Sequence, residues 1–133
     1  RICTKVVGFD ELPAQFDVVT CMELLEHVPD PASIVAACAT LARPDGTVVF
    51  ATINRTPTAY LHAVLGAEYV LQLLPRGTHD WAKFVTPAEL TGHLAPLGLE
   101  TVECRGVALH PLTWRWSLSS DTSVNYLQLH RRR

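Results

Sequence analysis

The sequence predicts an α/β fold built around a partly parallel β-sheet. Residues 16–21 and 47–53 are short, almost continuously apolar and rich in β-branched side chains, which is typical of strands covered on both faces in a parallel sheet. Segments with helix-start signals follow both of these predicted strands. Because strands alternate with helices and the chain has 133 residues, we expect α/β architecture and not more than one domain.

The remaining strand candidates lie at the two ends of the chain. Residues 2–7 form a weak candidate. Residues 99–109 and 122–130 alternate between apolar and polar side chains, which predicts an antiparallel pair at an edge of the sheet.

The first helix is predicted to begin at Asp30 and Pro31, because Asp is a favoured N-cap and Pro suits the first helical position. Pro44 is expected to end this helix, and the Asp45-Gly46 pair to turn the chain into the strand at 47–53.

The second helix is predicted from a capping box, formed by Thr86 and Glu89 on either side of Pro87. Leucines at helical spacing follow the box, and Gly98 is expected to close the helix.

Residues 54–86 form an insertion between these elements. Within it, residues 58–75 have a helical pattern that is apolar nearly all round. Such a helix must be buried against protein, for example as a lid over a site, or lie in a membrane surface. It is too short and too polar to span a bilayer comfortably, and both other interpretations stay open.

Composition excludes several classes of protein. Hydrophobic residues make up 48% and charged residues 18%, which excludes a largely disordered chain. Eleven Lys and Arg against thirteen Asp and Glu give a net charge of −2, so a dedicated nucleic-acid binder is not expected. The four cysteines are widely spaced and no signal peptide is visible, which favours free thiols in a reducing compartment.

Polar side chains gather where two predicted parallel strands end. Glu23, Glu26 and His27 follow the first strand at spacings i, i+3 and i+4, and Asn54 follows the second. A helical turn opening at Glu23 would project all three on one side, as a site for Mg²⁺, Mn²⁺ or Zn²⁺. His27 can instead act as a base that removes a proton. The third interpretation is a polar first turn of a helix.

Two further features are candidates for ligand contact. His79 lies in the Gly77–Trp81 cluster of the insertion and can contact substrate, act as a base or cap nearby backbone groups. Trp114 and Trp116 lie in the connection between the last two predicted strands, where they can line an apolar pocket or simply pack.

Residues 16–57 (FDVVTCMELLEHVPDPASIVAACATLARPDGTVVFATINRTP) resemble the second half of a class I S-adenosylmethionine-dependent methyltransferase, whose sheet is Rossmann-like. The continuation GAEYVLQLLPRGTHDWAKFVTPAEL and the later SVNY narrow the resemblance to the ubiquinone biosynthesis O-methyltransferase family. The EHVPDP motif is common among methyltransferases. Its combination with NRTP, GAEY, GTHDW and VNY, between Phe16 and Tyr126, is far more specific.

The resemblance implies methylation of a ring hydroxyl of a polyprenylated catechol or demethylated ubiquinol, with S-adenosylmethionine as donor. It places a magnesium site at Glu23, Glu26 and His27 and a cofactor contact at Met22. It implies membrane lipid contact through residues 58–75 and partners among other quinone-biosynthesis enzymes, with no nucleic acid. The expected location is the cytoplasmic face of the inner membrane in a bacterium, or the matrix side in a mitochondrion.

One departure from the family pattern sets the expected domain organisation. No glycine-rich G-x-G-x-G loop occurs in the chain, so residues 1–133 are expected to be an incomplete methyltransferase domain with a helical insertion or lid at 54–86. Cofactor binding by these residues alone should be weak. The alternatives are another small-molecule methyltransferase and a non-catalytic, truncated lipid-binding or scaffolding module.

Overall fold

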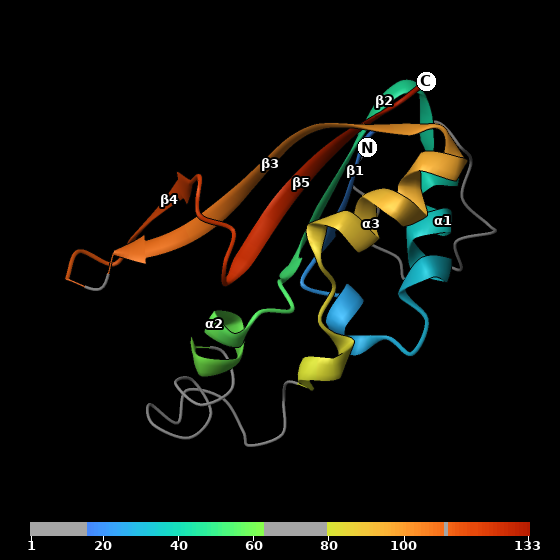
Figure 1. The fold of residues 1–133 in the computed structure, drawn as a ribbon. Coiled ribbons are helices and arrows are strands. Elements are labelled where there is room, and N and C mark those ends of the chain that lie inside the picture. Colours follow the sequence, from blue (N-terminus) through green and yellow to red (C-terminus); the bar gives the residue numbers. More distant parts are fainter. Residues whose placement is uncertain (1–15, 63–79, 111) are drawn as a thin grey trace, which may run out of the picture.

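The computed structural model describes residues 16–62, 80–110 and 112–133. These residues contain a five-stranded sheet in the order β1-β2-β5-β3-β4 (Figure 1). β1 and β2 are parallel, and the other neighbours are antiparallel, so the predicted mixed α/β sheet is confirmed. The weak strand candidate at 2–7 lies outside the described residues. The strands are β1 (Phe16–Met22), β2 (Ala42–Ile53), β3 (Leu99–His110), β4 (Arg115–Ser119) and β5 (Asn125–Arg132).

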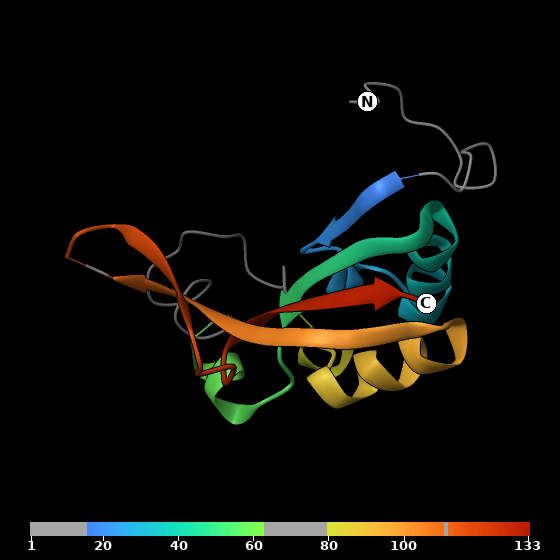
Figure 2. The same ribbon diagram turned by 90° about the horizontal axis from the view of Figure 1, so that it is seen from above.

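Two helices cover one face of this sheet, as Figures 1 and 2 show. α1 (Pro31–Leu41) packs on β1 and β2, and α3 (Pro87–Leu94) packs on β3 and against α1. A short helix, α2 (Pro57–Ala59), follows β2. Three 3₁₀ turns complete the described elements: η2 (Leu25–His27), η4 (Trp81–Lys83) and η5 (Ala95–Leu97).

Both predicted helix starts are confirmed. The Asp30 carboxylate accepts hydrogen bonds from the backbone N–H groups of Ala32 and Ser33, at 3.1 and 3.4 Å. Thr86 and Glu89 form the reciprocal capping box. These bonds use backbone donors that the first turn of a helix leaves without intrahelical partners.

The first helix ends earlier than Pro44, because α1 stops at Leu41 and β2 begins at Ala42. Asp45 and Gly46 do not form a separate turn before the strand but lie inside β2, where the pairing with β1 is irregular. Asp45 has φ 61°, and a Cβ at Gly46 would lie 2.7 Å from the carbonyl oxygen of Arg43. Only glycine fits this close backbone approach.

The hydrophobic core lies between the sheet and the two helices. Phe50 and Tyr126 from the sheet pack with Val35 of α1 and with Leu90 and Leu94 of α3, all fully or almost fully buried. Burial in β5 alternates through Tyr126, Gln128 and His130, as expected for a strand with one covered face.

Three strand expectations need correction. Coverage of both faces of β1 is not seen within the described residues, where Val18 is 58% exposed. The antiparallel pair is confirmed, but β5 lies between β2 and β3. The segment around Trp116 is itself a strand, β4, because it pairs with the outer half of β3.

The insertion is described only at its two ends. Thr56 caps α2 by accepting a hydrogen bond from the backbone N–H of Ala59 at 3.0 Å. Most of the predicted helix at 58–75, and His79, lie outside the described residues. Within the described residues, no helix is long and apolar enough to cross a membrane.

Candidate functional site

The ends of β1 and β2 lie side by side, as the sequence predicted. Met22 is in register with Ala51, and the backbone N–H of Glu23 donates to the carbonyl of Ala51 at 2.8 Å. Ligands of open α/β sheets bind beyond the carboxyl ends of parallel strands. The residues that follow Met22 and Ile53 therefore form the candidate site.

Glu26 is the most buried acidic group at this edge of the sheet. It is 3% exposed, and its Oε2 accepts a hydrogen bond of 2.7 Å from the hydroxyl of fully buried Thr52. The other carboxylate oxygen, Oε1, is buried and has no hydrogen-bond partner within the described residues. Burial of a carboxylate is costly without compensating partners, so this oxygen is a candidate to receive a donor, either from the protonated carboxyl group of neighbouring Glu23 or from a ligand.

Glu23 is placed differently from the expectation. Its φ is 49°, and the helical turn begins only at Leu25, so the three predicted residues do not share one face of a helix. The carboxyl group of Glu23 still lies close to that of Glu26. Glu23 as a whole residue is exposed, but desolvation of its carboxyl group, the charge of Glu26 and a hydrogen bond to Glu26 raise its pKa to about 7. The two carboxyl groups therefore act as a pair.

The other predicted site residues lie around this pair. Met22 ends β1 and is 50% exposed, which suits the predicted cofactor contact. His27 ends the η2 turn and is exposed. His79 lies outside the described residues.

The predicted metal ligands do not assemble as a set. Among residues 16–62, 80–110 and 112–133, no group of three or more His, Cys, Asp or Glu side chains is arranged to hold a metal ion. Glu23 and Glu26 come together, but His27 does not complete a three-ligand group with them. A cation at this edge would therefore depend on the Glu23–Glu26 pair alone among the described residues.

Asn54 marks the tip of β2. Its side-chain N–H donates to the carbonyl of Thr122 at 2.8 Å, and its backbone N–H donates to that of Val124 at 2.9 Å. Its buried Oδ1 has no hydrogen-bond partner within the described part of the chain. Asn54 thus joins the strand tips to the 121–125 segment that leads into β5. The sequence pointed to Asn54, but not to Thr52, because only the folded sheet brings Thr52 beside Glu26.

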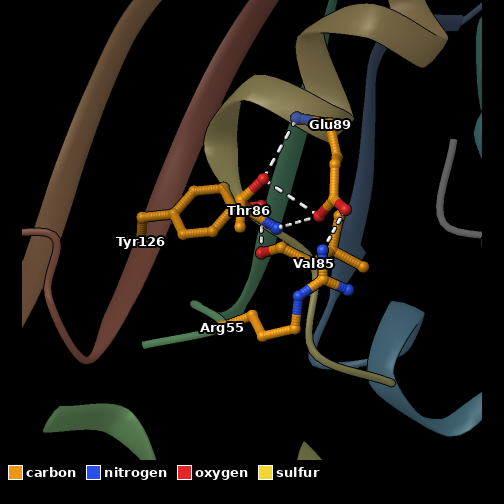
Figure 3. Close-up of polar contacts among 5 residues, drawn as sticks. All are labelled: Arg55, Val85, Thr86, Glu89 and Tyr126. Carbon is orange, nitrogen blue, oxygen red and sulfur yellow. Dashed lines mark hydrogen bonds and ion pairs between the residues drawn. The ribbon is translucent and has the colours of Figure 1, made fainter. Parts of the chain in front are cut away.

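A second polar cluster holds α3 against the end of β2 (Figure 3). Arg55 pairs with Glu89, whose carboxylate also accepts hydrogen bonds from the backbone and hydroxyl of Thr86, at 2.8 and 2.9 Å. These bonds lower the pKa of Glu89, and the hydrogen bond from the Thr86 backbone N–H has the largest effect. Beside them, the Tyr126 hydroxyl donates to the carbonyl of Val85 at 3.0 Å. Each carboxylate oxygen of Glu89 is satisfied, so this cluster is structural.

Comparison with known proteins identifies the kind of protein that carries this arrangement. The family model described as "Methyltransferase domain" matches residues 3–104. A protein from Ralstonia nicotianae, named ubiquinone biosynthesis O-methyltransferase, is 62% identical over 120 residues, which are 90% of this chain and 50% of that protein. A protein of the same name from Thiobacillus denitrificans is 61% identical, again over 90% of this chain and 52% of its own length.

Solved structures agree on the fold. The SAH-bound magnesium protoporphyrin IX methyltransferase of Synechocystis PCC 6803 superposes with a TM-score of 0.61 at 15% identity, covering 96% of this chain and 49% of that one. An Archaeoglobus fulgidus SAM-dependent methyltransferase gives 0.62 at 20% identity, covering 93% of this chain and 63% of that one.

The chain spans about half the length of the curated relatives it matches. The resemblance seen in the sequence is confirmed by these relatives, and the fold by the solved structures. The match of the family model to most of its residues shows that this chain belongs to the methyltransferase domain family.

Proposed function

We propose that the protein containing this chain is an S-adenosylmethionine-dependent O-methyltransferase that acts on a ring hydroxyl of a polyprenylated catechol or demethylated ubiquinol. The observation that carries the proposal is the buried Glu26 carboxylate at the joined tips of β1 and β2, held by Thr52 and lying beside the carboxyl group of Glu23. The names of the curated relatives support the substrate class.

The residues of this chain suit the cofactor side of such a site. When bound, S-adenosylmethionine supplies an electrophilic methyl group on a sulfonium. The half-exposed side chain of Met22 offers it an apolar surface at the end of β1, the place where open α/β sheets hold ligands.

The acceptor side requires a group that takes a proton. Transfer forms a bond between the acceptor oxygen and the methyl carbon, breaks the carbon–sulfur bond and releases the hydroxyl proton. Glu26 Oε1 can accept the hydrogen bond of that hydroxyl, and the Glu23–Glu26 pair can take its proton. Thr52 fixes the orientation of Glu26 through the bond to Oε2, so that little reorganisation is needed.

We also propose that Mg²⁺ can bind at the Glu23–Glu26 pair. Two carboxyl groups close together favour either a shared proton or a cation between them, and Glu23 and Glu26 are such a pair. We further propose that the protein works at a membrane surface, since an acceptor with a polyprenyl chain partitions into lipid.

The test is methyl transfer by the full-length protein that contains this chain. With labelled S-adenosylmethionine and a prenylated catechol, we expect a monomethylated product identified by mass spectrometry. A matched compound with both hydroxyls already methylated should give none. Absence of any methylated catechol, in a protein that binds S-adenosylhomocysteine, would contradict the proposed acceptor class.

The same assay tests the metal. If Mg²⁺ takes part, a chelator should reduce turnover, and Mg²⁺ should restore it. Full activity in the presence of a chelator would remove magnesium from the proposal and leave the carboxyl pair as the proton acceptor.

A further inference from the structure

The outer half of β3 and the strand β4 form a hairpin that leaves the body of the sheet. β3 pairs with β5 as far as Arg105 and pairs with β4 from Gly106 onward. In Figures 1 and 2 the hairpin reaches beyond the end of β5, on the side where α2 lies. It therefore projects from the same edge of the sheet as the tip of β2.

A pocket of about 540 Å³ lies against this hairpin. This volume is within the range of small-molecule sites. Val107 and Leu109 of β3 line it together with Trp116 of β4 and Val124 of the segment before β5. Leu109 and Trp116 are directly opposite each other in the hairpin, so they present one continuous apolar surface.

Four polar side chains also line the pocket, and each of them makes one hydrogen bond to nearby backbone. These bonds join His62 to Thr58 O, Ser119 Oγ to the N–H of Asp121, Asp121 Oδ1 to the N–H of Ser123, and Asn125 Oδ1 to the N–H of Val107. The apolar surface that a ligand would meet comes from the side chains on β3, on β4 and before β5.

The segment 121–125 links the wall of the pocket to the tip of β2. The segment 121–125 is held on one side by Asn54, through the bonds to Thr122 and Val124. On the other side it crosses β3 so closely that a Cβ at Gly106 would lie 1.6 Å from the carbonyl oxygen of Asp121. The pocket and the tip of β2 therefore share this segment.

We propose that this pocket binds the uncharged apolar chain attached to the ring of the methyl acceptor. The inference rests on the proposed function for the position of the ring. An isoprenoid chain matches the pocket because it offers apolar surface to Leu109, Trp116 and Val124. Trp116 and Leu109 would then determine preference for acceptors that carry a chain.

Two tryptophans of the hairpin provide a matched pair of variants. Trp116 lines the pocket and is 66% exposed, whereas Trp114 does not line it and is 73% exposed. Both are exposed enough that replacement by Ser should leave folding intact, which an unfolding curve checks. Leu109→Ser, on the opposite strand, is the second pocket variant.

The experiment measures binding to the full-length protein by calorimetry, with two probes: a catechol bearing a geranyl chain and the same catechol bearing a methyl group. We expect Trp116→Ser and Leu109→Ser to weaken binding of the geranyl compound by about tenfold, the loss expected when an apolar contact is removed. Binding of the methyl compound should stay unchanged, and Trp114→Ser should affect neither.

The proposal is overturned if neither pocket variant weakens binding of the geranyl compound, or if a pocket variant weakens binding of both compounds equally. It is also overturned if Trp114→Ser weakens binding of the geranyl compound as much as the pocket variants do, or if the parent protein binds both compounds equally well. Methyl transfer is scored separately. If the protein binds the geranyl compound selectively but transfers no methyl group, the proposed function is refuted and the chain-binding pocket is supported. If methyl transfer occurs and does not depend on Trp116 or Leu109, the proposed function is supported and the chain-binding pocket is refuted.

Discussion

The two ends of the sheet differ in whether their buried polar side chains have hydrogen-bond partners. At the end formed by the starts of β2 and β3, His130 is fully buried and both ring nitrogens have partners: Thr101 at 3.2 Å and Gln128 at 3.1 Å. At the other end, Glu26 and Asn54 each bury an oxygen with no partner within the described residues.

This difference separates scaffold from site. A buried polar group without a partner destabilises the fold by about 1–3 kcal/mol, so a fold keeps such groups where a ligand can use them. The satisfied end holds the helices on the sheet, and the unsatisfied end presents oxygens to a ligand. The comparison therefore favours the end that holds Glu26 and Asn54 as the place of the site.

Replacing Glu26 gives the largest expected effect. Glu26→Gln preserves shape and can still accept the Thr52 hydrogen bond, but it cannot take a proton. We expect kcat for methyl transfer by the full-length protein to fall by about 100-fold or more, while the free energy of unfolding stays the same or rises, because a buried carboxylate is costly. Steady-state kinetics and urea unfolding check both parts.

Glu100→Gln is the matched control at the satisfied end, where Glu100 pairs with Arg133 on the surface. It should leave kcat unchanged. Equal activity of Glu26→Gln and the parent protein would show that the Glu26 carboxylate is not part of the site. The difference between the two ends of the sheet would then say nothing about function.

The buried histidine predicts a pH dependence of stability. Burial lowers the pKa of His130 to about 4 from its ordinary value of 6.5. The unfolded chain therefore binds a proton between pH 6.5 and pH 4 that the folded chain does not, so the free energy of unfolding should fall as the pH is lowered through this range. We expect a loss on the order of 2 kcal/mol by pH 4.

Urea unfolding at pH 7, 5.5 and 4 measures this effect. His130→Gln should reduce the loss between pH 7 and pH 4, at the cost of lower stability at pH 7. His110→Gln, at an exposed position, controls for removal of a histidine in general. An unchanged pH dependence in His130→Gln would assign the acid sensitivity to other groups.

Features fixed by neighbours in the sequence could be predicted from the sequence. The caps at Asp30 and Thr86 depend on bonds to groups two or three residues away, and both were predicted. The parallel strands and the meeting of their tips were predicted as well, because short apolar runs rich in β-branched residues indicate strands.

Features fixed by contacts between distant segments could not. β4 contains arginine and serines and becomes a strand only by pairing with β3. Glu23 follows β1 with φ 49°, which breaks the helical spacing expected for it and His27. The Thr52–Glu26 bond joins residues 26 apart, and no local pattern indicates such a bond.

The smallest expected effect concerns two of the C-terminal arginines, Arg132 and Arg133. Arg132 donates to the carbonyls of Ala39 and Thr40, at 3.0 and 3.3 Å, and so satisfies the last turn of α1. Arg133 instead forms an exposed pair with Glu100. We expect Arg132→Ala to lower the free energy of unfolding by about 1 kcal/mol, and Arg133→Ala by about 0–0.5 kcal/mol.

Urea unfolding in low and high salt separates these two roles. Salt screens an exposed ion pair but barely affects hydrogen bonds to helix carbonyls, so the loss in Arg132→Ala should persist in high salt, and any loss in Arg133→Ala should vanish. If both losses were equal and both disappeared with salt, Arg132 would be a surface charge like its neighbour. The satisfied end of the sheet would then owe its stability to the buried His130 and Gln128 contacts, with no contribution from a cap on α1.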